Sequence, residues 1–143
     1  MLTQAEANLL IAMRKDFTST DTITIRPGTD ETFDLIGDDK RERFLLDLWR
    51  GTIKLSKVTY QTRSRRSIVL VRLDIEGSPH ENPDGDIIAC PHIHIYREGF
   101  EDKWAYSIDS SLFTNANDIY DALNDFFRYC NIQNVPPIQR ELL

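Results

Sequence analysis

Residues 90–99 read Cys-Pro-His-Ile-His-Ile-Tyr-Arg-Glu-Gly, and the rest of the chain is organised around this stretch. Polar and apolar side chains alternate along it, which is the period of a strand with one buried face. The two isoleucines therefore point to one side, and the other side carries the rings of His92, His94 and Tyr96. The third histidine of the chain, His80, lies just upstream in a loop rich in Pro and Gly. This row of rings is the candidate functional site.

Further strands are predicted on both sides of the histidine strand. The upstream segments with alternating or β-branched residues are 22–25, 32–36, 42–49, 53–60 and 67–75. The first two flank a turn signal and are expected to form a hairpin. The third also fits a helix, but the Gly51 that follows it favours a strand and a hairpin. Residues 103–108 predict a last strand that pairs with the histidine strand.

Both ends of the chain predict helices. Residues 3–16 begin with a Thr-x-x-Glu capping box, in which each side chain accepts a hydrogen bond from the other residue's backbone N–H. A second helix begins near Thr114 or Asn115 and ends at Asn131. Helix, strands and helix in this order predict an α+β fold. We expect one domain, residues 1–143, with a curved antiparallel sheet of about five to seven strands and both terminal helices packed on one face.

The composition is that of a globular domain with a single core. The chain has 143 residues, of which 41% are hydrophobic and 28% are charged, and a chain of this length buries a substantial core. No apolar run approaches a membrane span, and the N-terminus shows no signal peptide. Cys90 and Cys130 lack the spacing of metal ligands, so we expect free thiols in a reducing compartment. These features predict a cytoplasmic protein without a cofactor.

Charge is distributed unevenly along the chain. Between Lys40 and Arg72 there are ten basic and two acidic residues, whereas the remainder has seven basic and 21 acidic residues. Three of the basic residues, Arg63, Arg65 and Arg66, occupy a predicted turn between two strands. A basic patch of this kind suits a phosphate backbone or an acidic protein partner. The alternative is that these charged side chains only form the water-exposed faces of strands and bind no partner.

Three readings of the candidate site are open, and the first is acid–base chemistry without a metal. Histidine titrates near neutral pH, so His92 and His94 could take and give protons. If the strand of residues 67–75 pairs with the histidine strand, Arg72 joins the same face and could bind a phosphate with two hydrogen bonds. With Tyr96 as a further catalytic residue, this reading predicts a ribonuclease-like enzyme on an exposed sheet face.

The second reading is a metal site. A His-x-His strand places the imidazoles of His92 and His94 on one face at ligand spacing. The third ligand would come from the preceding loop, either from His80 or from Asp84. Two histidines alone are weak evidence for a metal, and the chain has no HExxH motif and no cysteine cluster.

The third reading is structural or interactive. The two strand histidines would hydrogen-bond to Tyr106, Glu98 or Asp74 and stabilise the hairpin. Exposed rings of Tyr96, Trp104 and Tyr106 would then form a binding surface, because aromatic residues concentrate binding energy at interfaces.

The chain also resembles a family of small, uncharacterised bacterial proteins of unknown function, some of them from phage-derived or mobile regions. The segments that carry the resemblance are residues 42–49, 53–60, 68–74, 79–85, 90–99 and 102–106. The resemblance implies an accessory role in a bacterial cytoplasm, in toxin–antitoxin systems, defence or counter-defence. It implies no catalytic residue and no substrate. We therefore expect a protein that binds nucleic acid or a nucleic-acid-processing protein, with no membrane partner, through residues Arg63, Arg65, Arg66, Trp104 and Tyr106.

Overall fold

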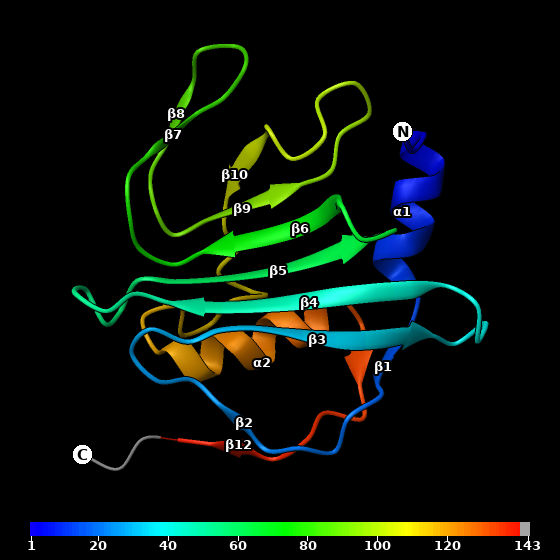
Figure 1. The fold of residues 1–143 in the computed structure, drawn as a ribbon. Helices are drawn as coiled ribbons and strands as arrows, with labels where there is room; N and C mark the ends of the chain where they lie inside the picture. The colour runs from blue at the N-terminus through cyan, green and yellow to red at the C-terminus, as the bar shows by residue number, and fades with distance from the viewer. Residues whose placement is uncertain (141–143) are drawn as a thin grey trace.

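The computed structural model describes residues 1–140 and shows an α+β fold with two helices and a mixed eight-stranded main sheet (Figure 1). The helices are α1 (Gln4–Ala12) and α2 (Ile119–Tyr129). The strands of the main sheet, in spatial order, are β10 (Ala105–Ser107), β9 (His92–Ile95), β6 (Ile68–Asp74), β5 (Val58–Ser64), β4 (Arg43–Arg50), β3 (Asp30–Gly37), β1 (Lys15–Phe17) and β11 (Ile132–Gln133). Two small sheets pair β2 (Ile23–Thr24) with β12 (Ile138–Gln139) and β7 (His80–Glu81) with β8 (Ile87–Ile88).

The sheet differs from the predicted one in size and in strand direction. It has eight strands, and β1 pairs with β11 in parallel, so it is not purely antiparallel. The strand β11 has two residues and follows α2 directly, which is too short for a recognisable pattern. The predicted hairpin of residues 22–25 with 32–36 is wrong, because β2 pairs with β12 near the C-terminus. The last three residues of the predicted domain, 141–143, lie outside the described residues.

The structure shows how the predicted N-terminal helix ends and whether residues 42–49 form a helix or a strand. The capping box forms at Thr3 and Glu6 as predicted. However, α1 ends at Ala12, because Lys15–Phe17 leaves the helix and joins the sheet as β1. Residues 42–49 form a strand, and β4 pairs with β3 on one side and β5 on the other. No described helix is long and apolar enough to cross a membrane.

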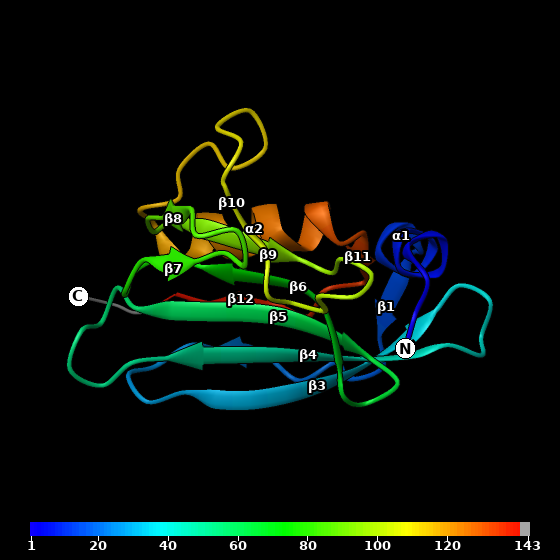
Figure 2. The ribbon, with the colours of Figure 1, turned by 90° about the horizontal axis from the view of Figure 1, so that it is seen from above.

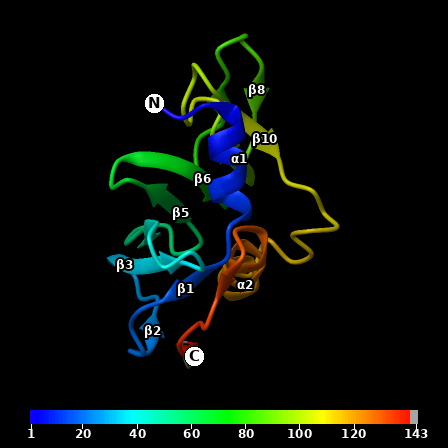
Figure 3. The same ribbon diagram turned by 90° about the vertical axis from the view of Figure 1, so that its right-hand side faces the viewer.

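The core lies between the sheet and α2. Along β4, Phe44, Leu46 and Leu48 are buried, whereas the residues between them are more exposed. The Tyr60 hydroxyl of β5 donates a hydrogen bond of 2.8 Å to the Ile119 carbonyl at the start of α2. The helix α2 lies behind the strands in Figure 1, and α1 stands near the ends of β5 and β6, above α2 in Figure 3.

The opposite side of the sheet has no helix over it among residues 1–140 (Figures 1 and 2). We call this side the open face. Strand register places polar side chains there in two adjacent rows. The first row, from β3 to β9, is Thr32, Asp47, Gln61, Arg72 and His94. The second row, from β4 to β9, is Trp49, Thr59, Asp74 and His92.

Candidate functional site

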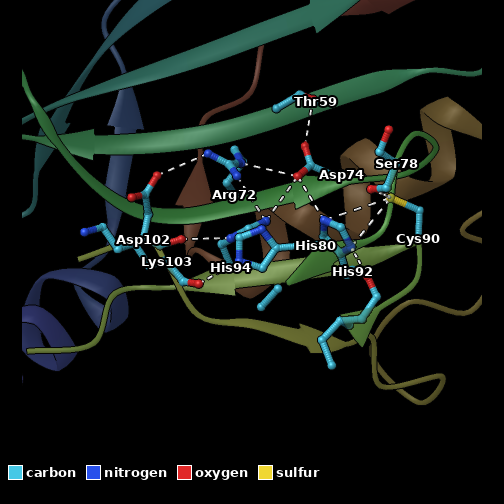
Figure 4. Close-up of polar contacts among 12 residues, drawn as sticks. Thr59, Arg72, Asp74, Ser78, His80, Cys90, His92, His94, Asp102 and Lys103 are labelled. Atoms are coloured by element: carbon cyan, nitrogen blue, oxygen red, sulfur yellow. Dashed lines mark hydrogen bonds and ion pairs between the residues drawn. The ribbon is translucent and has the colours of Figure 1, made fainter. Parts of the chain in front are cut away.

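The candidate site lies where β6 and β9 pair at the end of the open face. Their antiparallel register puts Arg72 opposite His94 and Asp74 opposite His92, so Arg72 and Asp74 share the face of the histidines, as expected if these two strands pair. The expectation that these histidines are exposed is wrong. His92 and His94 are 2% and 1% exposed. In Figure 4 the chain around Cys90 and the segment with Asp102 and Lys103 flank the two rings.

Each imidazole is held by a backbone carbonyl through its Nδ1 atom. His92 Nδ1 lies 3.1 Å from the Ile88 carbonyl oxygen, and His94 Nδ1 lies 2.8 Å from the Asp102 carbonyl oxygen. A carbonyl oxygen only accepts hydrogen bonds, so both Nδ1 atoms carry the proton. In the neutral tautomer, both Nε2 atoms then present a lone pair. Figure 4 shows the contact between His94 and Asp102 as a dashed line.

Both Nε2 atoms point at one carboxylate oxygen. Asp74 Oδ2 lies 3.2 Å from His92 Nε2 and 3.3 Å from His94 Nε2. Its other oxygen, Oδ1, accepts a 2.8 Å hydrogen bond from the Thr59 hydroxyl. Burial by itself would raise the pKa of Asp74, but the contacts with the two histidines, the bond from Thr59 and the charge of Arg72 hold that pKa well below its usual range. Asp74 is therefore ionised at neutral pH.

Arg72 lies between the acidic groups of the site. Its Nη2 is 3.0 Å from His94 Nε2, its Nε donates to Asp74 Oδ2 at 3.3 Å, and its Nη1 donates to Asp102 Oδ2 at 3.1 Å. One positive charge thus faces two carboxylates.

His80 is near the pair but directed elsewhere. Its ring centroid is 4.6 Å from that of His94, and its Nε2 lies 2.7 Å from the Lys103 carbonyl oxygen. The ligand atoms that lie within 4.8 Å of one another belong instead to Asp74, His92 and His94. We call these three residues the Asp–His cluster. The alternative ligand Asp84 accepts a hydrogen bond from a backbone N–H inside its own loop.

Tyr96 does not belong to the site, although the alternation placed it beside the histidines. It is 2% exposed. Its hydroxyl donates to the Leu2 carbonyl at 2.7 Å and accepts from the Leu2 N–H at 3.1 Å. Tyr96 therefore attaches the start of α1 to the end of β9, and the prediction that its ring is exposed is wrong; its catalytic role stays a prediction.

The predicted aromatic surface is present in part. Tyr106 on the edge strand β10 is 40% exposed. Trp104 is half-buried, with the Arg97 guanidinium 4.2 Å from its ring centroid and the Phe100 ring 5.7 Å away. The surface therefore includes Arg97 and Phe100, which the sequence did not single out.

The three arginines of the predicted basic turn differ in their surroundings. Arg63 makes two hydrogen bonds to Asp47, of 2.6 and 2.8 Å, and this hydrogen bonding raises the pKa of Arg63. Arg65 is exposed, with one guanidinium nitrogen 3.8 Å from Glu42. Arg66 is exposed as well. Arg63 lies on β5, whereas Arg65 and Arg66 lie on the turn between β5 and β6, which projects to the side opposite α2 (Figure 2).

Two supporting residues were not among the predicted site residues. Asp102 holds Arg72 with its side chain and His94 with its backbone. Asn82 forms a buried pair of hydrogen bonds with the backbone of Ala105, one of 2.9 Å and one of 2.8 Å, and so fastens the β7–β8 loop to β10. A sequence signal for them is weak, because Asp102 meets Arg72, and Asn82 meets Ala105, only across more than 20 positions of the chain.

Comparisons with known proteins identify a family and nothing beyond it. The model of a family of unknown function, DUF6978, matches residues 2–132, which is most of the chain. Among curated proteins and solved structures, none matches this chain.

Proposed function

We propose that this chain, which belongs to the DUF6978 family, binds nucleic acid through the open face and its basic turn. The observation that carries the proposal is the pair of exposed guanidinium groups, Arg65 and Arg66, on a turn that projects to the side without a helix (Figure 2). Exposed guanidinium groups bind phosphate oxygens, and this contact dominates the affinity of proteins for nucleic acids.

An exposed aromatic ring on the same face supports the proposal. Trp49 lies in the second polar row of the open face and is 37% exposed, and the Lys57 ammonium is 6.0 Å from its ring centroid. Bases stack on aromatic side chains in single-stranded nucleic acids, and neighbouring cations bind the backbone. Trp49 and Lys57 lie at one end of β4 and β5, whereas the basic turn lies at the other end of β5.

Burial of the histidines favours binding over the ribonuclease-like reading. A general base must come within about 3 Å of the proton that it removes. The Nδ1 atoms of His92 and His94 are engaged by carbonyl oxygens, and both rings are almost fully buried. The remaining ring nitrogens, the two Nε2 atoms, contact Asp74. Neither histidine is therefore placed to reach a substrate on the open face.

Binding can be tested by fluorescence anisotropy with labelled single-stranded RNA, single-stranded DNA and duplex DNA of about 20 nucleotides. Affinity should fall as salt rises from about 50 to 200 mM. Arg66→Gln should weaken binding and flatten the salt dependence by about one phosphate contact. The matched control is Arg140→Gln, which removes one exposed guanidinium that pairs with Asp121 of α2.

The results that contradict the proposal are specific. Wild-type protein without salt-dependent binding to any of the three nucleic acids would overturn it. Equal losses in the Arg66→Gln and Arg140→Gln proteins would do the same, because the effect would then reflect net charge alone. A Trp49→Ala variant should lose affinity for the single strands more than for the duplex, since only unpaired bases can stack on the ring.

A further inference from the structure

We propose that the Asp–His cluster, Asp74, His92 and His94, is a binding site for one divalent transition-metal ion of the zinc class. This site is independent of the nucleic-acid contacts proposed above. The sequence predicted no cofactor, and its metal alternative used His80 in place of Asp74. The structure assigns the third ligand to β6, opposite the histidine strand.

The hydrogen-bonding pattern is the first argument. Histidines that bind metals almost always donate the other ring N–H to a carbonyl or a carboxylate, which orients the ring. Here the carbonyl oxygens of Ile88 and Asp102 accept from the two Nδ1 atoms, and both Nε2 atoms lie within 3.3 Å of Asp74 Oδ2. The Nε2 atom of His94 also accepts from the guanidinium of Arg72, which can only donate. A cation held among the three ligand atoms is attracted to the carboxylate and to both ring nitrogens.

Distances are the second argument. Zinc binds imidazole nitrogen at about 2.0–2.1 Å and carboxylate oxygen at about 2.0–2.2 Å, so neighbouring ligand atoms of a tetrahedral site are about 3.3–3.4 Å apart. The two measured separations from Asp74 Oδ2 are 3.2 Å to His92 Nε2 and 3.3 Å to His94 Nε2. Both separations from Asp74 thus already match the spacing that the ion requires, and all three ligand atoms lie within 4.8 Å of one another.

The donor set and the charge identify the class of ion. Two imidazoles with one carboxylate suit Zn²⁺, Co²⁺ and Fe²⁺, whereas Mg²⁺ and Ca²⁺ prefer oxygen ligands alone. Three protein ligands leave a fourth position for water or another small ligand. The carboxylates of Asp74 and Asp102 are paired with the single guanidinium of Arg72, so a cation is favoured electrostatically.

Arg72 is the competing cation. Its Nη2 is 3.0 Å from His94 Nε2, so it uses the lone pair that the metal needs. The same guanidinium already donates to Asp102 Oδ2 at 3.1 Å, and the Arg72 side chain is 27% exposed. Metal binding therefore requires the guanidinium to turn toward Asp102 and away from His94. Removing Arg72 should strengthen metal binding.

The test uses full-length protein that has been stripped with a chelator and then titrated with Zn²⁺ by calorimetry. We expect one ion per chain and a higher melting temperature with Zn²⁺ than without it. Co²⁺ should give the visible absorption of a tetrahedral site, and Mg²⁺ should give no response. Asp74→Asn should weaken Zn²⁺ binding by more than about 100-fold, because losing a ligand exceeds the usual cost of losing a supporting group.

Two further variants keep the proposal falsifiable if Asp74→Asn does not fold. Arg72→Gln should bind Zn²⁺ more tightly than wild type. His80→Gln, a matched histidine control outside the cluster, should bind it equally well. Absence of Zn²⁺ binding by wild type would overturn the proposal. A loss of binding in His80→Gln, or wild-type affinity in a folded Asp74→Asn protein, would also overturn it, because the ligands would then be different residues.

Discussion

The buried lysine at the start of β1 should make the stability of this protein depend on pH in an unusual direction. Lys15 is 0% exposed. Its ammonium donates three hydrogen bonds to carbonyl oxygens, at 2.9 Å to Ile11, 2.8 Å to Met13 and 2.8 Å to Cys130. The Phe44 ring centroid is 4.9 Å away. Lys15 thus joins the end of α1 to the end of α2, and all three ammonium protons have partners.

Burial lowers the pKa of Lys15 from 10.5 to about 8, although interactions with Cys130 and Asp38 raise it in part. Between these values the unfolded chain holds a proton that the folded protein has released. Because the unfolded state binds more protons there, the free energy of unfolding rises with pH. From pH 8 to pH 9, Lys15 alone should contribute an increase of about 1 kcal/mol.

Two other buried groups act in the opposite direction at higher pH. Burial raises the pKa of the Cys130 thiol from 9.0 to about 12, and burial raises the pKa of Tyr60 above its usual 10.0. The folded protein keeps these protons after the unfolded chain has lost them, so their effect is to lower stability above about pH 9 and pH 10 respectively. We therefore expect stability to rise from pH 8 to pH 9 and to fall above pH 10.

Urea unfolding at pH 7, 8, 9 and 10, followed by circular dichroism, measures this profile. Lys15→Met should be less stable at pH 7, because carbonyls such as that of Cys130 lose a buried donor, at a cost of about 1–3 kcal/mol. It should also lack the increase between pH 8 and pH 9. Lys57→Met, at an exposed lysine, should keep it. A flat wild-type profile, or an unchanged increase in Lys15→Met, would refute this account.

Two further variants test contacts that only the tertiary structure forms. Tyr96→Phe removes both hydrogen bonds to the Leu2 backbone and should lower the free energy of unfolding by about 1–3 kcal/mol. Thermal melting measures this loss. An unchanged melting temperature would count against the role of Tyr96 in attaching the start of α1 to β9. Asn82→Ala should release the β7–β8 loop from β10, so the Ala105 amide should exchange its hydrogen faster. The Tyr60 amide, which is the control, should exchange at an unchanged rate. Equal protection of the Ala105 amide in variant and wild type would be inconsistent with this contact.

Local patterns in the sequence determined several features that the structure confirms. Alternation along residues 90–99 placed the two histidines on one side of their strand, and alternation along residues 67–75 placed Arg72 and Asp74 on one side of theirs, because side chains in a strand alternate whatever the strand pairs with. The capping box at Thr3 predicted the start of α1, since it depends on residues three positions apart. The α+β class followed from the order of these elements.

Tertiary structure alone decided what these side chains touch. The same alternation placed Tyr96 beside His94, but the Tyr96 hydroxyl contacts Leu2, 94 positions earlier in the chain. The segments that bury the histidines contribute mainly backbone carbonyls, such as that of Asp102, and every residue type has a carbonyl. Asp74 becomes the third member of the Asp–His cluster only through pairing of β6 with β9. Such contacts depend on the path of the whole chain, so no local pattern of residue types encodes them.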